Sequence, residues 1–154
     1  MAVPQLPGWQ HQILRGVGAP ITPQNLSALN AWAHTESGTA TNNPFNTTMT
    51  MQNMAGATPY NTIQTKNGPI HVWNYTSPQQ GINATINTLN NGYYGDIIGA
   101  LRAGTNPMAV ARAVDASPWG TSGMTDVMRN WPTAVPSTLP TSFLPRALPS
   151  MRMF

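Results

Sequence analysis

Helix-starting signals divide this sequence into short segments, and their spacing limits what the chain can fold into. Thr22-Pro23 places a capping residue before a helix-initiating proline, and Asn106-Pro107 starts another helix in the same way. Ser77 and Gln80 form a capping box. Apolar residues follow each signal at helical spacing. The sequence therefore predicts helices that run to Gly38, to about residue 91 and to Ser117-Pro118, with Gly38 as the C-terminal glycine of the first.

The segments between these helices add two shorter helices and a hairpin. Ile13 and Leu14 indicate a helix that ends at residues 16–18, and residues 96–104 indicate another. Tyr60–Gln64 and Ile70–Tyr75 are β-like runs joined around Asn67-Gly68, a strong turn signal. The polar stretch from residue 39 to 58 is expected to be loop, with one short strand near residues 48–52. We expect an α+β, mostly α-helical fold with a small antiparallel hairpin.

The character of the sequence changes at residue 132. Prolines then recur every four or five residues, separated by Thr, Ser and Leu, and the tail ends in the apolar residues Leu148, Met151, Met153 and Phe154. This pattern predicts an extended, polyproline-like tail. Such a tail is either a free terminus or a segment that docks on a partner, and its low charge favours docking. We therefore divide the chain into a domain at 1–131 and a Pro-rich tail at 132–154.

Charge is scarce: 7% of the 154 residues are charged, and the formal net charge is +3. The seven basic residues are scattered singly, which is not typical of a nucleic-acid-binding face. The small positive charge suits an anionic polymer such as a bacterial cell wall, or it has no functional meaning. There is no cysteine, and no apolar stretch is long enough to span a membrane. The N-terminus lacks the apolar region of a signal peptide, so none is expected.

Glu36 is the only glutamate and the strongest candidate for a chemical role. It shares a predicted helix face with Leu29, Trp32 and Ala33. An apolar wall and the partial negative charge of a helix C-terminus both favour the protonated acid. Such an acid is what cleavage of a glycosidic bond needs, because the leaving oxygen must receive a proton. On spacing alone, an exposed glutamate at a helix end is the favoured interpretation.

The sequence around Glu36 resembles a known family. The motifs are Ala31-Trp32-Ala33-His34-Thr35-Glu36-Ser37-Gly38, Asn42-Asn43-Pro44-Phe45-Asn46-Thr47-Thr48, the region Tyr75 to Tyr94, and Ala113-Val114 with Ser117-Pro118-Trp119-Gly120-Thr121. Together they resemble the lysozyme-like domains of actinobacterial phages, which are similar to goose-type lysozymes and soluble lytic transglycosylases. The resemblance covers roughly residues 8–123.

The resemblance implies a lysozyme-like fold whose cleft binds the glycan strands of peptidoglycan. Glu36 would protonate the oxygen that links N-acetylmuramic acid to N-acetylglucosamine, and the family's catalytic glutamate opens a Glu-Ser motif, here with Ser37. The candidate substrate-binding residues are Ser37, Asn43, Asn46, Tyr75, Gln80, Tyr93 and Trp119. The asparagines also suit turns, and the aromatic residues also suit a core.

The sequence offers no second carboxylate in the hairpin region, since no acid lies between Glu36 and Asp96. Asp96 is expected to complement a helix dipole, and Asp115 and Asp126 to form local ion pairs with Arg112 and Arg129. A retaining mechanism with two carboxylates is therefore disfavoured. The related transglycosylases use the substrate's own 6-hydroxyl and the goose-type enzymes use water, and the sequence leaves both open.

Two functions follow as hypotheses. The first is a phage enzyme that cleaves peptidoglycan, either carried in the virion, with tail 132–154 bound to other virion proteins, or released at lysis. The second is a structural virion or tail protein that keeps the fold with weak or no catalysis. The three histidines lie far apart in sequence, so neither a metal site nor a cofactor is expected.

Overall fold

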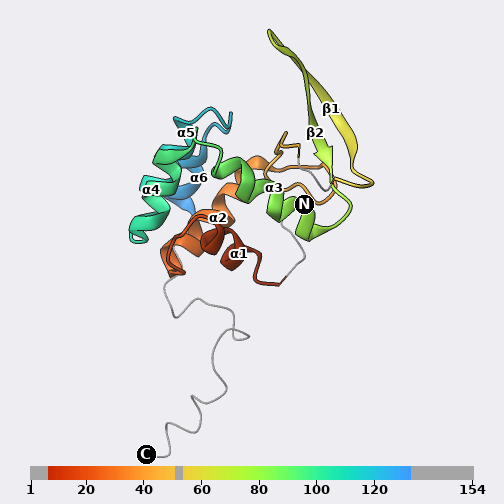
Figure 1. Ribbon diagram of the computed structural model, residues 1–154. Coiled ribbons are helices and arrows are strands. Elements are labelled where there is room, and N and C mark those ends of the chain that lie inside the picture. Colours follow the sequence, from red (N-terminus) through yellow and green to blue (C-terminus); the bar gives the residue numbers. More distant parts are fainter. Residues whose placement is uncertain (1–6, 51–53, 133–154) are drawn as a thin grey trace, which may run out of the picture.

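The computed structural model describes residues 7–50 and 54–132. The elements follow in the order α1 (Trp9–Gly16), α2 (Pro23–Glu36), β1 (Thr58–Thr65), β2 (Gly68–Asn74), α3 (Pro78–Leu89), α4 (Gly95–Ala103), α5 (Pro107–Asp115) and α6 (Met124–Asn130). The described part of the chain is thus mostly helical with one small antiparallel sheet, as predicted (Figure 1).

The predicted N-terminal caps are confirmed for three helices. The side chains of Thr22, Ser77 and Asn106 each accept a hydrogen bond from the backbone N–H three residues later, and a proline occupies the first helical position in each case. These caps satisfy donors that a helix start otherwise leaves free. At α3 the Gln80 Oε1 atom also accepts from the Thr76 backbone N–H at 2.9 Å, so the side chain reaches back beyond the helix start.

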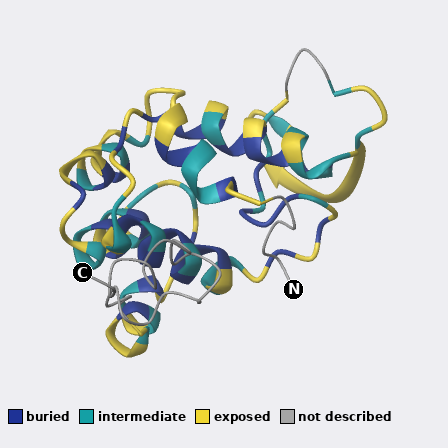
Figure 2. Ribbon diagram, turned by 90° about the horizontal axis from the view of Figure 1, so that it is seen from below, coloured by how far each residue is buried: buried dark blue, intermediate teal, exposed yellow. Residues whose placement is uncertain are grey.

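Helix α2 lies at the centre of the hydrophobic core. Ala28, Leu29, Ala31, Trp32 and Ala33 are all fully buried. They belong to one cluster with apolar residues of the other helices and of the loop after α2, among them Ile13, Leu14, Phe45, Ile82, Ile97, Leu101, Val110, Val114 and Met124. Figure 2 shows buried residues, in dark blue, along the helices. Burial of this cluster fixes where the C-terminal end of α2, and so Glu36, lies.

The β1–β2 hairpin extends away from the helices (Figure 1). Every residue of β1 is exposed, whereas Val72 of β2 is buried. Thr65 pairs with Gly68 across the turn, and the register is irregular between Pro59 and Asn61. The predicted turn is confirmed, with Gly68 at a left-handed φ of 108°. Val72 is the one buried residue of the two strands, so the sheet adds little to the core.

The hairpin base is bonded to the loop that follows α2. The Asn43 Nδ2 atom donates to the Trp73 carbonyl at 2.9 Å, and the Asn42 Nδ2 atom donates to the Tyr75 carbonyl at 3.0 Å. The Tyr75 backbone N–H in turn donates to the Thr41 carbonyl at 2.9 Å. These bonds couple the position of β2 to the segment directly after Glu36.

The C-terminal end of α2 differs from the prediction. Gly38 is not the left-handed residue, because Ser37 takes that role with a φ of 46°. Gly38 is required for a different reason: a Cβ atom there would lie 2.8 Å from the Asn43 carbonyl oxygen and 2.9 Å from Asn46 Oδ1. The glycine therefore lets the returning loop approach the end of α2 closely.

The sequence does not single out helix α6, because it is short and follows Gly123, which offers no side-chain cap. Residues 48–50 form no strand, and 51–53 lie outside the described residues, as does tail 132–154 beyond residue 132. Within residues 7–50 and 54–132, no helix is long and apolar enough to cross a membrane.

Candidate active site

Glu36 is the last residue of α2, and its carboxylate is held by the loop that follows the helix and by a loop far along the chain. The Thr121 hydroxyl donates to Glu36 Oε1 in a short contact, and the Asn46 Nδ2 atom donates to Glu36 Oε2 at 3.0 Å. The same Asn46 nitrogen also lies 3.2 Å from the Glu36 carbonyl oxygen. The side chain is half-buried, so it retains some access to solvent. Both oxygens therefore have a defined partner.

The segment after Glu36 has an unusual backbone. Ser37, Asn42 and Asn46 have φ values of 46°, 56° and 54°, and they are the only non-glycine residues with positive φ in the described part of the chain. A left-handed backbone is costly for most residues and is least so for asparagine. Clusters of such residues occur where the surrounding structure holds a site in place. Here the three turns bring the chain back so that Asn46 reaches the Glu36 carboxylate.

The second partner, Thr121, lies in the loop of residues 116–123 between α5 and α6. Thr121 is buried, and its hydroxyl oxygen accepts a hydrogen bond from Trp32 Nε1 at 3.2 Å. Trp119 of the same loop donates from Nε1 to the Phe45 carbonyl at 2.8 Å. Its ring also packs edge-on against Trp32, with centroids 4.9 Å apart. The loop is thus attached to α2 and to the segment that follows it.

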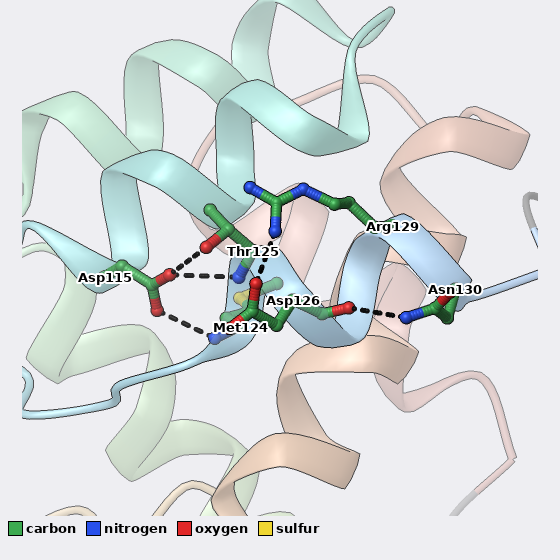
Figure 3. Close-up of polar contacts among 6 residues, drawn as sticks. All are labelled: Asp115, Met124, Thr125, Asp126, Arg129 and Asn130. Atoms are coloured by element: carbon green, nitrogen blue, oxygen red, sulfur yellow. Dashed lines mark hydrogen bonds and ion pairs between the residues drawn. The ribbon is translucent and has the colours of Figure 1, made fainter.

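Asp115 closes this loop at its ends (Figure 3). One carboxylate oxygen accepts from the Met124 backbone N–H at 2.9 Å, and the other accepts from the Thr125 backbone N–H and hydroxyl at 2.9 and 2.8 Å. The prediction that Asp115 pairs with Arg112 is therefore wrong: the carboxylate caps α6 across the loop, which spacing along one helix could not indicate. A carboxylate at a helix N-terminus also complements the helix dipole.

The other acids have ordinary structural positions. Asp126 forms an ion pair with Arg129, as predicted, and both side chains are exposed (Figure 3). Asp96 lies in the first turn of α4, where it complements the dipole. Because the Asp115 carboxylate caps α6, Glu36 is the acid at this site. No group of three or more His, Asp or Glu side chains in the described residues is arranged to hold a metal ion.

Of the predicted substrate-binding residues, Asn46 contacts Glu36. Trp119 lies in the same loop as Thr121, the other partner of Glu36. Asn43 and Tyr75 are buried and support the loop after α2. The Asn43 amide donates to the carbonyls of Thr47 and Trp73, each at 2.9 Å. The Tyr75 hydroxyl donates to the Met49 carbonyl at 3.0 Å and lies 2.9 Å from the Thr47 hydroxyl. Burial raises the pKa of Tyr75, which keeps the phenol neutral.

The remaining predicted residues lie at the surface or at a helix start. Ser37 is exposed, and its hydroxyl donates to the His34 carbonyl at 2.7 Å. Gln80 is part of the α3 cap, and the Tyr93 side chain is 76% exposed. Ser37 and Tyr93 are thus accessible to a ligand.

Thr121 was not among the predicted site residues. The sequence contains Trp119-Gly120-Thr121 as a motif, but it gives no indication that the Thr121 hydroxyl contacts a residue 85 positions earlier.

Searches against protein-family models, curated proteins and solved structures found no match to this chain.

Proposed function

We propose that this chain is a peptidoglycan-cleaving glycosidase in which Glu36 is the general acid. The observation that carries the proposal is the carboxylate of the sole glutamate, half-buried at the end of a core helix and held at each oxygen by a donor from a different segment. A general acid must be held in place to deliver a proton to a leaving oxygen. The resemblance of the sequence to phage lysozyme-like domains supplies the substrate class.

In this proposal Glu36 protonates the oxygen between C1 of N-acetylmuramic acid and C4 of N-acetylglucosamine as the C1–O bond breaks. The nucleophile then forms a bond to C1 and gives its proton to the Glu36 carboxylate, which restores the acid. If the nucleophile is the 6-hydroxyl of the same muramic acid, the product is a 1,6-anhydro sugar. If it is water, the product has a reducing end.

The positions of the other acids support a mechanism with one carboxylate. A retaining glycosidase places its second carboxyl group about 5 Å from the first, and an inverting one about 6.5–9.5 Å away. Asp115, Asp96 and Asp126 are engaged at helix starts or in an exposed ion pair. The 6-hydroxyl or a water held by polar side chains is therefore the nucleophile in our proposal.

Cellular placement is part of the proposal. We propose that the protein acts from a phage virion or after lysis, and that tail 132–154 attaches it to other virion proteins. The alternative is a structural virion protein with the same fold, and the low charge of the chain, 7%, is the observation that favours it.

Wall degradation by a Glu36→Gln variant tests the proposal. The native chain should release soluble fragments from purified walls, and Glu36→Gln should release none, because the amide has no acid proton to give. Asp96→Asn is the matched control, since it removes the same charge at an exposed helix start and should remain active. Equal release by the native chain and Glu36→Gln would overturn the role of Glu36, and no release by the native chain would favour the structural alternative.

A further inference from the structure

Three polar groups form a hydrogen-bonded chain that ends on Glu36. The Trp32 indole Nε1 donates to the Thr121 hydroxyl oxygen at 3.2 Å, and the Thr121 hydroxyl donates to Glu36 Oε1. Trp32 is fully buried and Thr121 is 7% exposed, so water does not compete freely for these bonds. The chain joins helix α2 to the loop of residues 116–123.

The chemistry of the first member sets the direction of this chain. An indole N–H donates and cannot accept, whereas a hydroxyl has one proton and two acceptor positions. Trp32 occupies one acceptor position of Thr121, and the hydroxyl gives its one proton to Glu36 Oε1. Glu36 Oε1 is therefore held by a donor that is itself held by Trp32.

Asn46 fixes the other half of the carboxyl group. Its Nδ2 atom lies 3.0 Å from Oε2 and 3.2 Å from the Glu36 carbonyl oxygen, so a single amide group connects the side chain to its own backbone. One acceptor position of Oε2 is used in this way. Each carboxyl oxygen thus keeps a second position, where an acid proton can be bound and given up.

We propose that Thr121 is a positioning residue for Glu36: the Trp32–Thr121 chain orients the carboxyl group that gives up the proton. This inference rests on the proposed function for its catalytic meaning, while the hydrogen-bonded chain is testable without it. Asp115 supports Thr121 indirectly, because its three bonds to Met124 and Thr125 hold the ends of the loop together.

The first test compares Thr121→Val, which keeps the shape and removes the hydroxyl, with Thr121→Ser, which keeps the hydroxyl. On soluble peptidoglycan strands, Thr121→Val should lower kcat by about tenfold or more with KM little changed, because a misplaced acid affects the chemical step. Thr121→Ser should stay within about threefold of the native chain. Thermal unfolding, measured in parallel, ensures that folded variants are compared. Native activity in Thr121→Val, or an equal loss in both variants, would overturn the proposal.

The second test does not depend on activity. The indole N–H signal of Trp32, assigned in the ¹⁵N-labelled full chain, should shift across the acidic range in which carboxyl groups titrate. The shift should persist in Thr121→Ser and vanish in Thr121→Val and in Glu36→Gln. His34 remains in all these variants, so any movement caused by His34 would survive. If the Trp32 signal of the native protein does not shift with pH, or shifts equally in Glu36→Gln, the hydrogen-bonded chain from Trp32 to Glu36 is refuted. If the native protein cleaves no wall, the proposed function fails and this measurement alone decides the inference.

Discussion

At the scale of single residues, the site depends on the backbone after Glu36 as much as on side chains. Asn46 combines both roles, since its φ of 54° places its amide on the Glu36 carboxylate. Asparagine adopts this conformation at lower cost than most residues, and glycine adopts it freely. Its backbone and side-chain contributions can therefore be separated by substitution.

Asn46→Ala and Asn46→Gly should both lose wall-cleaving activity, because each removes the amide that bonds Glu36 Oε2. Their stabilities should differ: Asn46→Ala should unfold about 1 kcal/mol more easily than Asn46→Gly, since alanine is strained in the left-handed region. Urea unfolding measures this difference. Equal stability of the two variants would show that the backbone strain is absent. Full activity of Asn46→Gly would show that the Asn46 amide is not needed for cleavage.

The sequence indicates Glu36 as a candidate but does not indicate how its carboxylate is held. The spacing of Leu29, Trp32, Ala33 and Glu36 defines one helix face, and this local pattern is confirmed by the burial of the three apolar residues. Asn46 follows ten residues later and was a candidate. Thr121 was not, because its contact depends on how two helices and a loop pack together, which local spacing does not specify.

At the scale of elements, α3 is joined to the loop after α2 by a close backbone approach at Gly81. A Cβ atom there would lie 1.7 Å from the Asn42 carbonyl oxygen, so no side chain fits. Gly99 in α4 provides a matched control because a Cβ atom there would meet nothing within 4 Å.

Gly81→Ala should destabilise the fold strongly, by roughly 2 kcal/mol or more, despite the better helix propensity of alanine, because overpacking outweighs propensity. Gly99→Ala should stabilise α4 by roughly 0.5–1 kcal/mol. Thermal or urea unfolding of both variants checks the prediction. Similar effects of the two substitutions would contradict the close approach of α3 to the loop.

Helix α6 is held in place by a neighbouring element. Asp115→Asn removes the charge that caps its first turn and should cost about 1–2 kcal/mol of stability. Asp126→Asn, in the same turn, breaks an exposed ion pair and should cost less than about 1 kcal/mol. Asp115→Asn should also reduce activity, because the capped loop carries Thr121. If the two variants are equally stable and active, Asp115 does not support the site.

Helix α6 also differs from the other helices in how far its start could be predicted from the sequence. The helices that begin with Thr22, Ser77 and Asn106 contain their own caps and could be predicted from a few adjacent residues. Helix α6 takes its cap from Asp115, nine residues before Met124. A local pattern does not contain such a cap, so the element was missed.

At the scale of the whole molecule, the fold buries neutral groups and few charges. Within the described residues one ion pair is present, between Arg129 and Asp126, and it is exposed. Burial raises the pKa of Tyr75 and of Tyr94 above the ordinary value of about 10. Stability should therefore depend on pH in the range where these phenols ionise.

The sign of this dependence follows from proton binding. Above about pH 10 the unfolded chain loses its tyrosine protons while folded Tyr75 and Tyr94 keep theirs, so the unfolded state binds fewer protons. The contribution of the two phenols to the free energy of unfolding should be unchanged below about pH 10, and it should be lost as the pH rises through the folded pKa values. Tyr75→Phe should be less stable overall but should show a shallower fall. Unfolding midpoints measured on both sides of pH 10 test this, and an equal slope in both proteins would contradict it.

The measurement that tests the central claim most directly is mass spectrometry of peptidoglycan after incubation with the native chain and with Glu36→Gln. We predict glycan fragments cleaved after N-acetylmuramic acid from the native chain and none from the variant. Anhydro-muramyl ends would identify the 6-hydroxyl as the nucleophile, and reducing ends would identify water. Intact strands from the native chain, or the same fragments from Glu36→Gln, would contradict Glu36 as the acid of a wall-cleaving enzyme.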